Sequence, residues 1–193
     1  MESLDTLLTE VRDCRFCEGL PLGPKPILQV GSPKARLLIT GQAPGTLAHE
    51  SGITFNDPSG DRLREWLQID RDTFYNDSLV AIIPMGFCYP GRLEKGGDRP
   101  PRKECAPKWR EKLLQHLPDI KLTLLVGSYA QNYVLGKGKV TDRVRDFQDY
   151  LPQYFPLPHP SWRTLAWVKK NPYFEDEILV VLREKVKQIL QVR

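Results

Sequence analysis

The chain has 193 residues, 40% of them hydrophobic and 27% charged, which is enough for one ordinary globular core, and its formal net charge is +4. Its mean hydropathy is −0.41, and no run approaches the roughly 18 apolar residues that a membrane helix needs, which excludes a transmembrane protein. The N-terminal residues are acidic and helical in pattern, unlike a secretory signal. We therefore expect a single domain over residues 1–193, located in the cytoplasm.

The N-terminal half predicts a helix, a strand and a second helix. Ser3 precedes leucines spaced for one apolar helical face, which is typical of a capped helix. Residues 35–40 form a short apolar run that ends at Gly41, which indicates a buried strand. Asp57 followed by Pro58 has the order of an N-cap and a first helical residue.

The C-terminal half predicts strands over residues 78–84, 122–126 and 154–157, and a closing helix over residues 175–192. Strands that are separated by helical segments indicate a mostly parallel sheet covered on both faces. We expect an α/β fold, a three-layer αβα sandwich with a short, mostly parallel central sheet of about four strands. Because ligands bind beyond the carboxyl ends of such strands, the loop of residues 41–45 is a candidate site.

Charge and cysteine both need an explanation. Eight lysines or arginines and four acids lie between residues 92 and 112, a local net charge of +4. Such a segment suits an anionic partner, although a charge run is as often a solvated face. The chain has four cysteines, and a reducing compartment disfavours structural disulfides. Four thiolates can hold an iron–sulfur cluster or a zinc ion, and unrelated buried thiols are the third interpretation.

Several motifs occur in an order that resembles the uracil-DNA glycosylase superfamily. They are Gly41-Gln42-Ala43-Pro44-Gly45, Phe55 before Asp57-Pro58-Ser59-Gly60, and His159-Pro160-Ser161. The cysteine spacing resembles that of the iron–sulfur members, families 4 and 5, and runs through Cys14, Cys17, Cys88 and Cys105. The resemblance implies a 4Fe–4S cluster held by these four thiolates, with a structural zinc ion as the alternative. It also implies DNA as the partner.

The resemblance further implies a pocket for a base flipped out of DNA, because the glycosidic bond is unreachable inside the stack. Phe55 falls where the family places an aromatic that stacks on the base, and a core phenylalanine is the alternative. Gln42, Ala43 and Asn56 would bind the same substrate. His159 would donate a hydrogen bond to the departing carbonyl oxygen, as an oxyanion donor does, although isolated histidines are often structural.

The chain departs from these relatives at two places. Gln42 stands where family 4 enzymes carry Glu, and Ala43 where family 1 enzymes place a catalytic Asp. Asp57, which matches the family 5 carboxylate, is therefore the expected catalytic carboxylate that positions water and stabilises the cationic sugar. The same residue type is an excellent N-cap without any catalysis. Pro84 replaces an Asn that reads the base four residues before Cys88, which opens the specificity to hypoxanthine or xanthine as well as uracil.

Ser161, Trp162 and Arg163 form the loop that we expect to contact DNA, because an apolar wedge beside a cation can fill the gap left by a flipped nucleotide. Packing of Trp162 on Trp167 is the alternative. We expect a monomeric, monofunctional glycosylase that acts on duplex or single-stranded DNA. A non-catalytic iron–sulfur protein that binds nucleic acid or senses redox state is the second interpretation. His49 is expected in an exposed loop.

Overall fold

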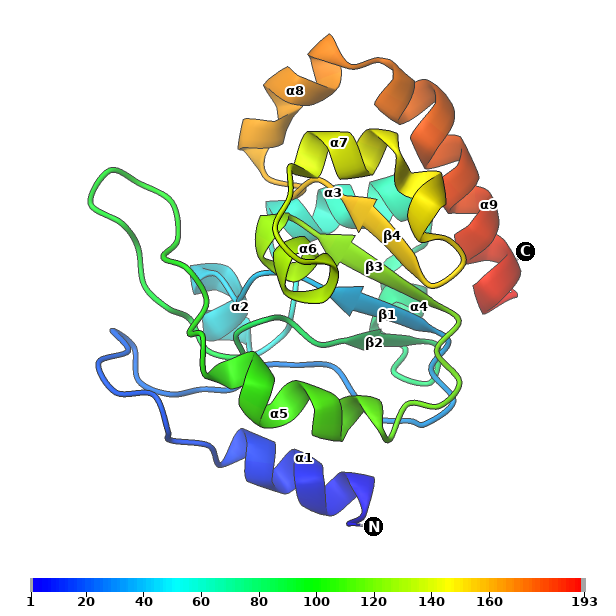
Figure 1. Ribbon diagram of the computed structural model, residues 1–193. Coiled ribbons are helices and arrows are strands. Elements are labelled where there is room, and N and C mark those ends of the chain that lie inside the picture. Colours follow the sequence, from blue (N-terminus) through cyan, green and yellow to red (C-terminus); the bar gives the residue numbers. More distant parts are fainter. Residues whose placement is uncertain (1, 192–193) are drawn as a thin grey trace.

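The structure of the protein is a computed structural model that describes residues 2–191. Four strands form one sheet in the order β2-β1-β3-β4, and every pairing is parallel (Figure 1). The strands are β1 (Leu37–Thr40), β2 (Val80–Ile82), β3 (Leu122–Val126) and β4 (Tyr154–Leu157). The predicted fold class is confirmed, and β3 and β4 have the predicted bounds.

Side chains alternate between the two faces of the sheet, as the pleat requires. Leu37 and Ile39 of β1 point into the larger core, together with Leu124 of β3. This face is covered by α3 (Pro58–Leu67), α4 (Arg71–Tyr75), α7 (Val140–Arg145), α8 (Leu165–Lys170) and α9 (Leu179–Leu190). The predicted closing helix begins as a π-helical turn over Phe174–Ile178, and its predicted last residue, Val192, lies outside the described residues.

The opposite face of the sheet has its own core. Leu38 of β1 and Ile83 pack there with apolar side chains of two helices, α1 (Leu4–Arg12) and α5 (Cys105–Leu114). Farther along, α6 (Ser128–Leu135) packs against Leu125. Helices thus cover both faces, as Figure 1 shows, and the three layers are those expected. No helix within residues 2–191 is long and apolar enough to cross a membrane.

The strand order locates the site. β1 pairs with β2 on one side and with β3 on the other, so the chain reverses its direction of winding between β1 and β3. Ligands in open parallel sheets bind at the carboxyl ends of strands beside such a reversal. At this edge the loop after β1 leads into α2 (Thr46–Ser51), and the loops after β2 and β4 lie nearby.

Candidate active site

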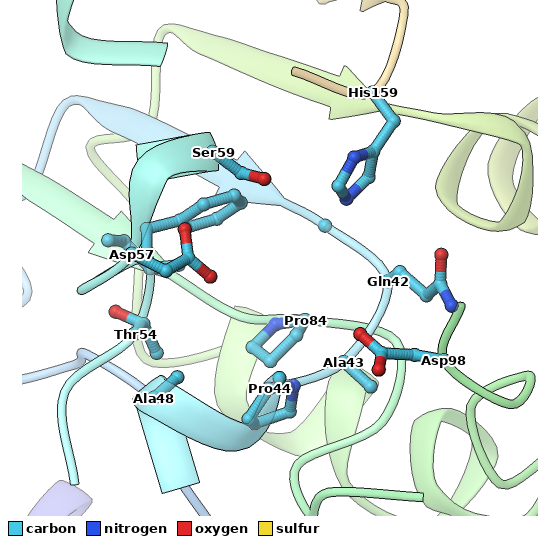
Figure 2. A pocket seen from close by; sticks show the side chains of 14 residues that line it. Gln42, Ala43, Pro44, Ala48, Thr54, Asp57, Ser59, Pro84, Asp98 and His159 are labelled. Atoms are coloured by element: carbon cyan, nitrogen blue, oxygen red, sulfur yellow. The ribbon is translucent and has the colours of Figure 1, made fainter. Parts of the chain in front are cut away.

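A pocket opens at the carboxyl edge of the sheet (Figure 2). Segments far apart in the sequence meet in it: the loop after β1, the start of α3, the chain after β2 and the chain after β4. The lining residues are Gly41, Gln42, Ala43, Pro44, Gly45, Ala48, Thr54, Phe55, Asp57, Ser59, Ile82, Pro84, Asp98 and His159. The structure therefore brings together both predicted catalytic residues and three of the four predicted substrate contacts.

Phe55 occupies space that two glycines leave free. Its φ is 52°, in the left-handed region that is uncommon for a bulky residue. A Cβ on Gly41 would stand 2.9 Å from Cζ of the Phe55 ring, and a Cβ on Gly60 would stand 1.7 Å from the Phe55 carbonyl oxygen. The ring meets Phe74 edge-on, with centroids 6.2 Å apart, and also lines the pocket. Core packing and base contact are therefore compatible roles for this ring.

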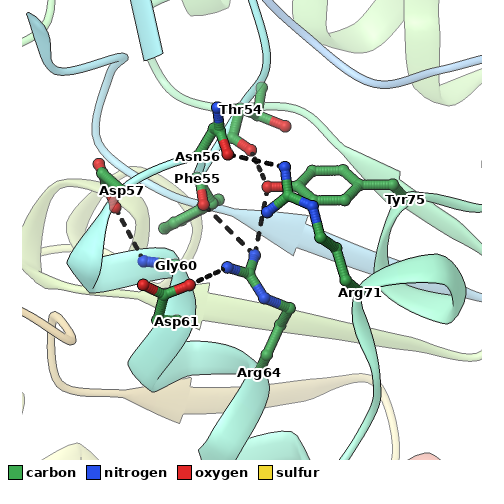
Figure 3. Close-up of polar contacts among 9 residues, drawn as sticks. All are labelled: Thr54, Phe55, Asn56, Asp57, Gly60, Asp61, Arg64, Arg71 and Tyr75. Carbon is green, nitrogen blue, oxygen red and sulfur yellow. Dashed lines mark hydrogen bonds and ion pairs between the residues drawn. The ribbon is translucent and has the colours of Figure 1, made fainter. Parts of the chain in front are cut away.

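A buried arginine supports the loop that carries Phe55 (Figure 3). Arg64 is only 8% exposed, and its guanidinium donates to the carbonyl oxygen of Phe55 at 3.4 Å and to the Tyr75 hydroxyl at 3.2 Å. The Tyr75 hydroxyl in turn donates to the carbonyl oxygen of Thr54 at 2.9 Å. Asp61 forms an ion pair with Arg64 at 2.5 Å. Because the loop's carbonyl groups have these donors, its pocket-facing side chains are positioned in advance.

Asn56 lies beside the pocket rather than in it. Its Oδ1 accepts a hydrogen bond from the Arg71 guanidinium at 2.7 Å (Figure 3), and Asn56 does not line the pocket. The neighbouring Phe55 faces the pocket, so the two side chains of this turn diverge. In this arrangement the side chain of Asn56 is engaged in holding the loop to α4.

Asp57 caps α3 and also lines the pocket. As the N-cap of α3 it adopts an extended backbone, and its Oδ1 accepts from the Gly60 amide at 2.8 Å, with Pro58 following as the first helical residue. Its Oδ2 faces the pocket, 3.9 Å from where a Cβ of Gly45 would stand. One carboxylate oxygen therefore caps the helix while the other remains available to a substrate.

His159 follows β4 and enters the pocket from the side opposite Ala48 and Pro44 (Figure 2). Gly127, at the end of β3, makes room for it, because a Cβ there would stand 3.4 Å from the His159 Cβ. Burial lowers the pKa of His159, and the Asp57 carboxylate opposes this effect. The imidazole is therefore neutral at neutral pH and has an N–H to donate.

Thr54 lines the pocket and was not anticipated from the sequence. Its side chain is only 5% exposed, and its hydroxyl has no hydrogen-bond partner within the described part of the chain. A buried polar group without a partner is costly, and such a group in a pocket is well placed to bond a ligand. No sequence motif marks this residue, because a threonine in a loop is ordinary.

Asp98 is the second pocket residue that the sequence interpretation missed. It lies on a hairpin of residues 91–99, which an antiparallel bridge between Arg92 and Asp98 closes. The side-chain amide of Gln42 holds the hairpin to the loop after β1, because it donates to the Arg99 carbonyl oxygen at 3.3 Å. Partial burial raises the pKa of Asp98; Asp57 also raises it, and Arg92 opposes the shift. The Gly-Gly pair within this segment is a turn signal that could have revealed the hairpin.

The predicted DNA-contacting residues lie next to this hairpin. Trp162 is 72% exposed, and the Arg163 guanidinium lies 5.5 Å from the centre of its ring. The same guanidinium lies against the hairpin, because a Cβ on Gly97 would stand 2.9 Å from its nitrogens. Among the described residues Trp167 forms its aromatic contacts with Tyr173 and Phe174 and not with Trp162. Trp162 is thus free to contact a partner.

The four cysteines converge on one hollow between α1, the chain after β2 and α5. Cys14, Cys17, Cys88 and Cys105 all line it, and none forms a disulfide. Cys105 accepts a hydrogen bond from the Phe87 amide at 3.3 Å, and burial raises the pKa of Cys105 to about 12. No group of three or more His, Cys, Asp or Glu side chains within residues 2–191 is arranged to hold a metal ion.

The structure qualifies one expectation and corrects another. Arg110 does not contribute its charge to the surface of the basic segment 92–112, because it is 3% exposed and donates to the Thr40 hydroxyl at 3.0 Å beneath the sheet. The expectation that His49 lies in an exposed loop is wrong. His49 belongs to α2, its ring lies 6.0 Å from that of Tyr89, and its buried Nδ1 has no partner among the described residues.

The sequence and fold place the chain in a known family. The family model "Uracil DNA glycosylase superfamily" matches residues 28–183, so the chain belongs to this superfamily. A curated type-4 uracil-DNA glycosylase from Sulfurisphaera tokodaii is 26% identical over 141 residues, 71% of this chain and 60% of that protein. A second one, from Archaeoglobus fulgidus, is 27% identical over 139 residues, 69% of this chain and 64% of that protein.

The chain thus spans just under two thirds of the length of these curated relatives. A solution NMR structure of a protein from Methanosarcina acetivorans aligns with 82% of this chain and 99% of its own, at 15% identity. Its TM-score of 0.43 is too low to bear on function.

Proposed function

We propose that this protein is a DNA glycosylase that hydrolyses the N-glycosidic bond of a deaminated base, uracil first among them, and leaves an abasic site. The observation that carries the proposal is the pocket itself. It joins an aromatic ring and a carboxylate from the segment before α3 with a half-buried imidazole from the chain after β4, in a chain that belongs to the uracil-DNA glycosylase superfamily. These are the groups that base extrusion and bond cleavage need.

Each of the three groups has a distinct task in this proposal. The Phe55 ring stacks on the flipped base, a contact typically worth about 1 to 3 kcal/mol that offsets part of the cost of extrusion. His159, neutral because burial lowers its pKa, donates a hydrogen bond to the carbonyl oxygen of the departing base. The free oxygen of Asp57 stabilises the positive charge that develops on the sugar.

We also propose that Cys14, Cys17, Cys88 and Cys105 hold a 4Fe–4S cluster. All four thiols line one hollow with otherwise mostly apolar walls, which is a suitable donor set. A single zinc ion draws its thiolates to about 2.3 Å from one atom, whereas a four-iron cluster binds each thiolate at a separate iron and needs a wider frame. When bound, the cluster would tie α1, the chain after β2 and α5 together.

A panel of labelled oligonucleotides tests the proposed activity. Single-stranded and duplex DNA with one uracil, hypoxanthine or xanthine is incubated with the protein and then treated with alkali, which cleaves at abasic sites. We expect strand cleavage at uracil and none in an undamaged oligonucleotide of the same sequence. Cleavage at none of the three bases, by protein that binds the DNA, would contradict the proposal.

A second candidate function is favoured by two lining residues. Gln42 cannot ionise, and Pro84 offers neither a side-chain donor nor a backbone donor, yet both face the pocket. A pocket that lacks an ionisable side chain at position 42 and a hydrogen-bond donor at position 84 suits a protein that binds a lesion without excising it. Tight binding to uracil-containing DNA without base release would support this candidate.

A further inference from the structure

Two carboxylates from distant parts of the chain converge on the pocket. A Cβ built on Gly45 would stand 3.5 Å from Oδ2 of Asp98 and 3.9 Å from Oδ2 of Asp57, so both oxygens approach the same point. Asp57 belongs to the start of α3 and Asp98 to the 91–99 hairpin, so only the fold makes them neighbours. In Figure 2 their side chains extend into the pocket from different elements.

The two carboxylates differ in how they are engaged. Oδ1 of Asp57 is bound to the Gly60 amide as the cap of α3. The Asp98 carboxylate, by contrast, has neither a hydrogen bond nor an ion pair with any side chain or amide within residues 2–191. Asp98 is an exposed residue at the rim of the pocket, and desolvation of its carboxylate there raises its pKa, with Arg92 and Arg163 opposing the shift.

Gln42 connects the two sides of this arrangement. Its side-chain amide donates to the carbonyl oxygen of Arg99, the residue after Asp98, at 3.3 Å. The loop after β1 contains no acidic residue, but through this hydrogen bond it anchors the hairpin that carries Asp98. The base of the hairpin is closed further by the Arg99 amide, which donates to the Gly91 carbonyl oxygen at 2.8 Å.

We propose that Asp98 is a second catalytic carboxylate, which accepts the proton of the attacking water, and that Gln42 positions it through the hairpin. The inference rests on the proposed glycosylase function. The water oxygen bonds to C1′ of the sugar while the C1′–N bond breaks and its electron pair leaves with the base. The water's proton passes to Asp98 and then to solvent, and the departing base takes up a proton from solvent. Asp57 faces the cationic sugar.

The test is single-turnover release of uracil by the full chain, with a matched control on the same hairpin. Asp98→Asn keeps the shape of the side chain and removes the base, and we expect the rate to fall about 100-fold at unchanged DNA affinity. Glu94→Gln makes the same change of charge at an exposed hairpin position outside the pocket, and we expect the wild-type rate. Asp98→Glu, which retains a carboxylate, should recover part of the rate.

A double-mutant comparison tests the role of Gln42. We expect Gln42→Ala to slow release about tenfold in the wild-type background and to have no further effect in Asp98→Asn, because it acts only through Asp98. Equal slowing in both backgrounds would show that Gln42 acts on the substrate directly and would overturn its positioning role.

The outcomes separate this inference from the proposed function. If the wild type releases none of the three bases, both fail. If the wild type is active and Asp98→Asn is as fast as Glu94→Gln, only the catalytic role of Asp98 fails. Loss of rate together with loss of DNA binding in Asp98→Asn would also overturn it, because the carboxylate would then act in docking rather than in the reaction.

Discussion

The titration of His159 follows from its surroundings. Because burial lowers its pKa, the imidazole should titrate below the ordinary value of 6.5 and stay neutral throughout the neutral range. Asp57 opposes the shift, so removal of its charge in Asp57→Asn should lower the pKa of His159 further. NMR titration of the imidazole protons, assigned by comparison with His159→Gln, measures both values. A midpoint above 6.5, or a rise in Asp57→Asn, would contradict this electrostatic account.

Removal of the Thr54 hydroxyl should change stability and activity in opposite directions. Thr54→Val keeps the branched shape and removes a buried hydroxyl that has no partner in the described protein. The free energy of unfolding should stay equal or rise by about 1 kcal/mol, because a desolvated polar group is lost. Base release should slow about tenfold if the hydroxyl bonds the base. Chemical denaturation and excision assays measure the two effects, and unchanged excision would exclude the base contact.

At the scale of single elements, the start of α3 allows capping and catalysis to be separated. Asp57→Asn preserves an N-cap oxygen, so stability should hold while base release falls by orders of magnitude. Asp57→Ala should lose the same activity and also about 0.5 to 2 kcal/mol of stability. Thermal unfolding and single-turnover kinetics on both variants measure this difference. An unchanged rate in Asp57→Asn would remove this carboxylate from the mechanism.

The elements also show how far the sequence predicts the fold. The strands at 122–126 and 154–157 have the predicted bounds, because their apolar runs coincide with the hydrogen-bonded ladder. The strands predicted at 35–40 and 78–84 are shorter in the structure, where they span Leu37–Thr40 and Val80–Ile82, although Ala35 and Ile83 beyond their ends are buried as well. Burial is visible in sequence, whereas the end of a ladder depends on the neighbouring strand.

The hairpin 91–99 shows why the site was predicted only in part. Phe55, Asp57 and His159 were predicted because each lies in or beside a short motif that resembles one of the uracil-DNA glycosylase superfamily. Asp98 lies in a segment whose abundant charges suggested a basic surface, and its place in the pocket depends on a long-range contact from Gln42. A contact across 57 residues leaves no periodic pattern in the sequence.

At the scale of the whole molecule, the proposed cluster between α1 and α5 predicts the iron and sulfide content of the purified protein. Protein purified without oxygen should be coloured and contain about four irons and four sulfides per chain, as a 4Fe–4S cluster requires. Replacement of Cys105 by serine should lower the iron content and the thermal stability together. Colourless, iron-free wild-type protein would exclude the cluster, and stoichiometric zinc would support the alternative.

The proposed DNA contact of the exposed loop beyond β4 predicts how DNA affinity depends on salt concentration. If Arg163 and its neighbours neutralise three or four phosphates, the logarithm of duplex affinity should fall with the logarithm of salt concentration with a slope of roughly −3 to −4. Arg163→Ala should reduce the magnitude of this slope by about 1, whereas Trp162→Ala should weaken binding without changing it. Fluorescence anisotropy at several salt concentrations measures both slopes, and identical slopes for Arg163→Ala and wild type would remove this phosphate contact.

The close packing of Phe55 against Gly41 and Gly60 limits which amino acids these three positions can accept. The aromatic ring fills the space that a side chain at position 41 would need, and its carbonyl oxygen fills the space at position 60. Gly41 and Phe55 therefore form a size-complementary pair, so that a smaller residue at 55 is a precondition for a larger one at 41. Gly60 has no such freedom, because the atom it faces is backbone. In a library randomised at the three positions, changes at 41 should survive selection only with changes at 55, whereas 60 should remain glycine throughout.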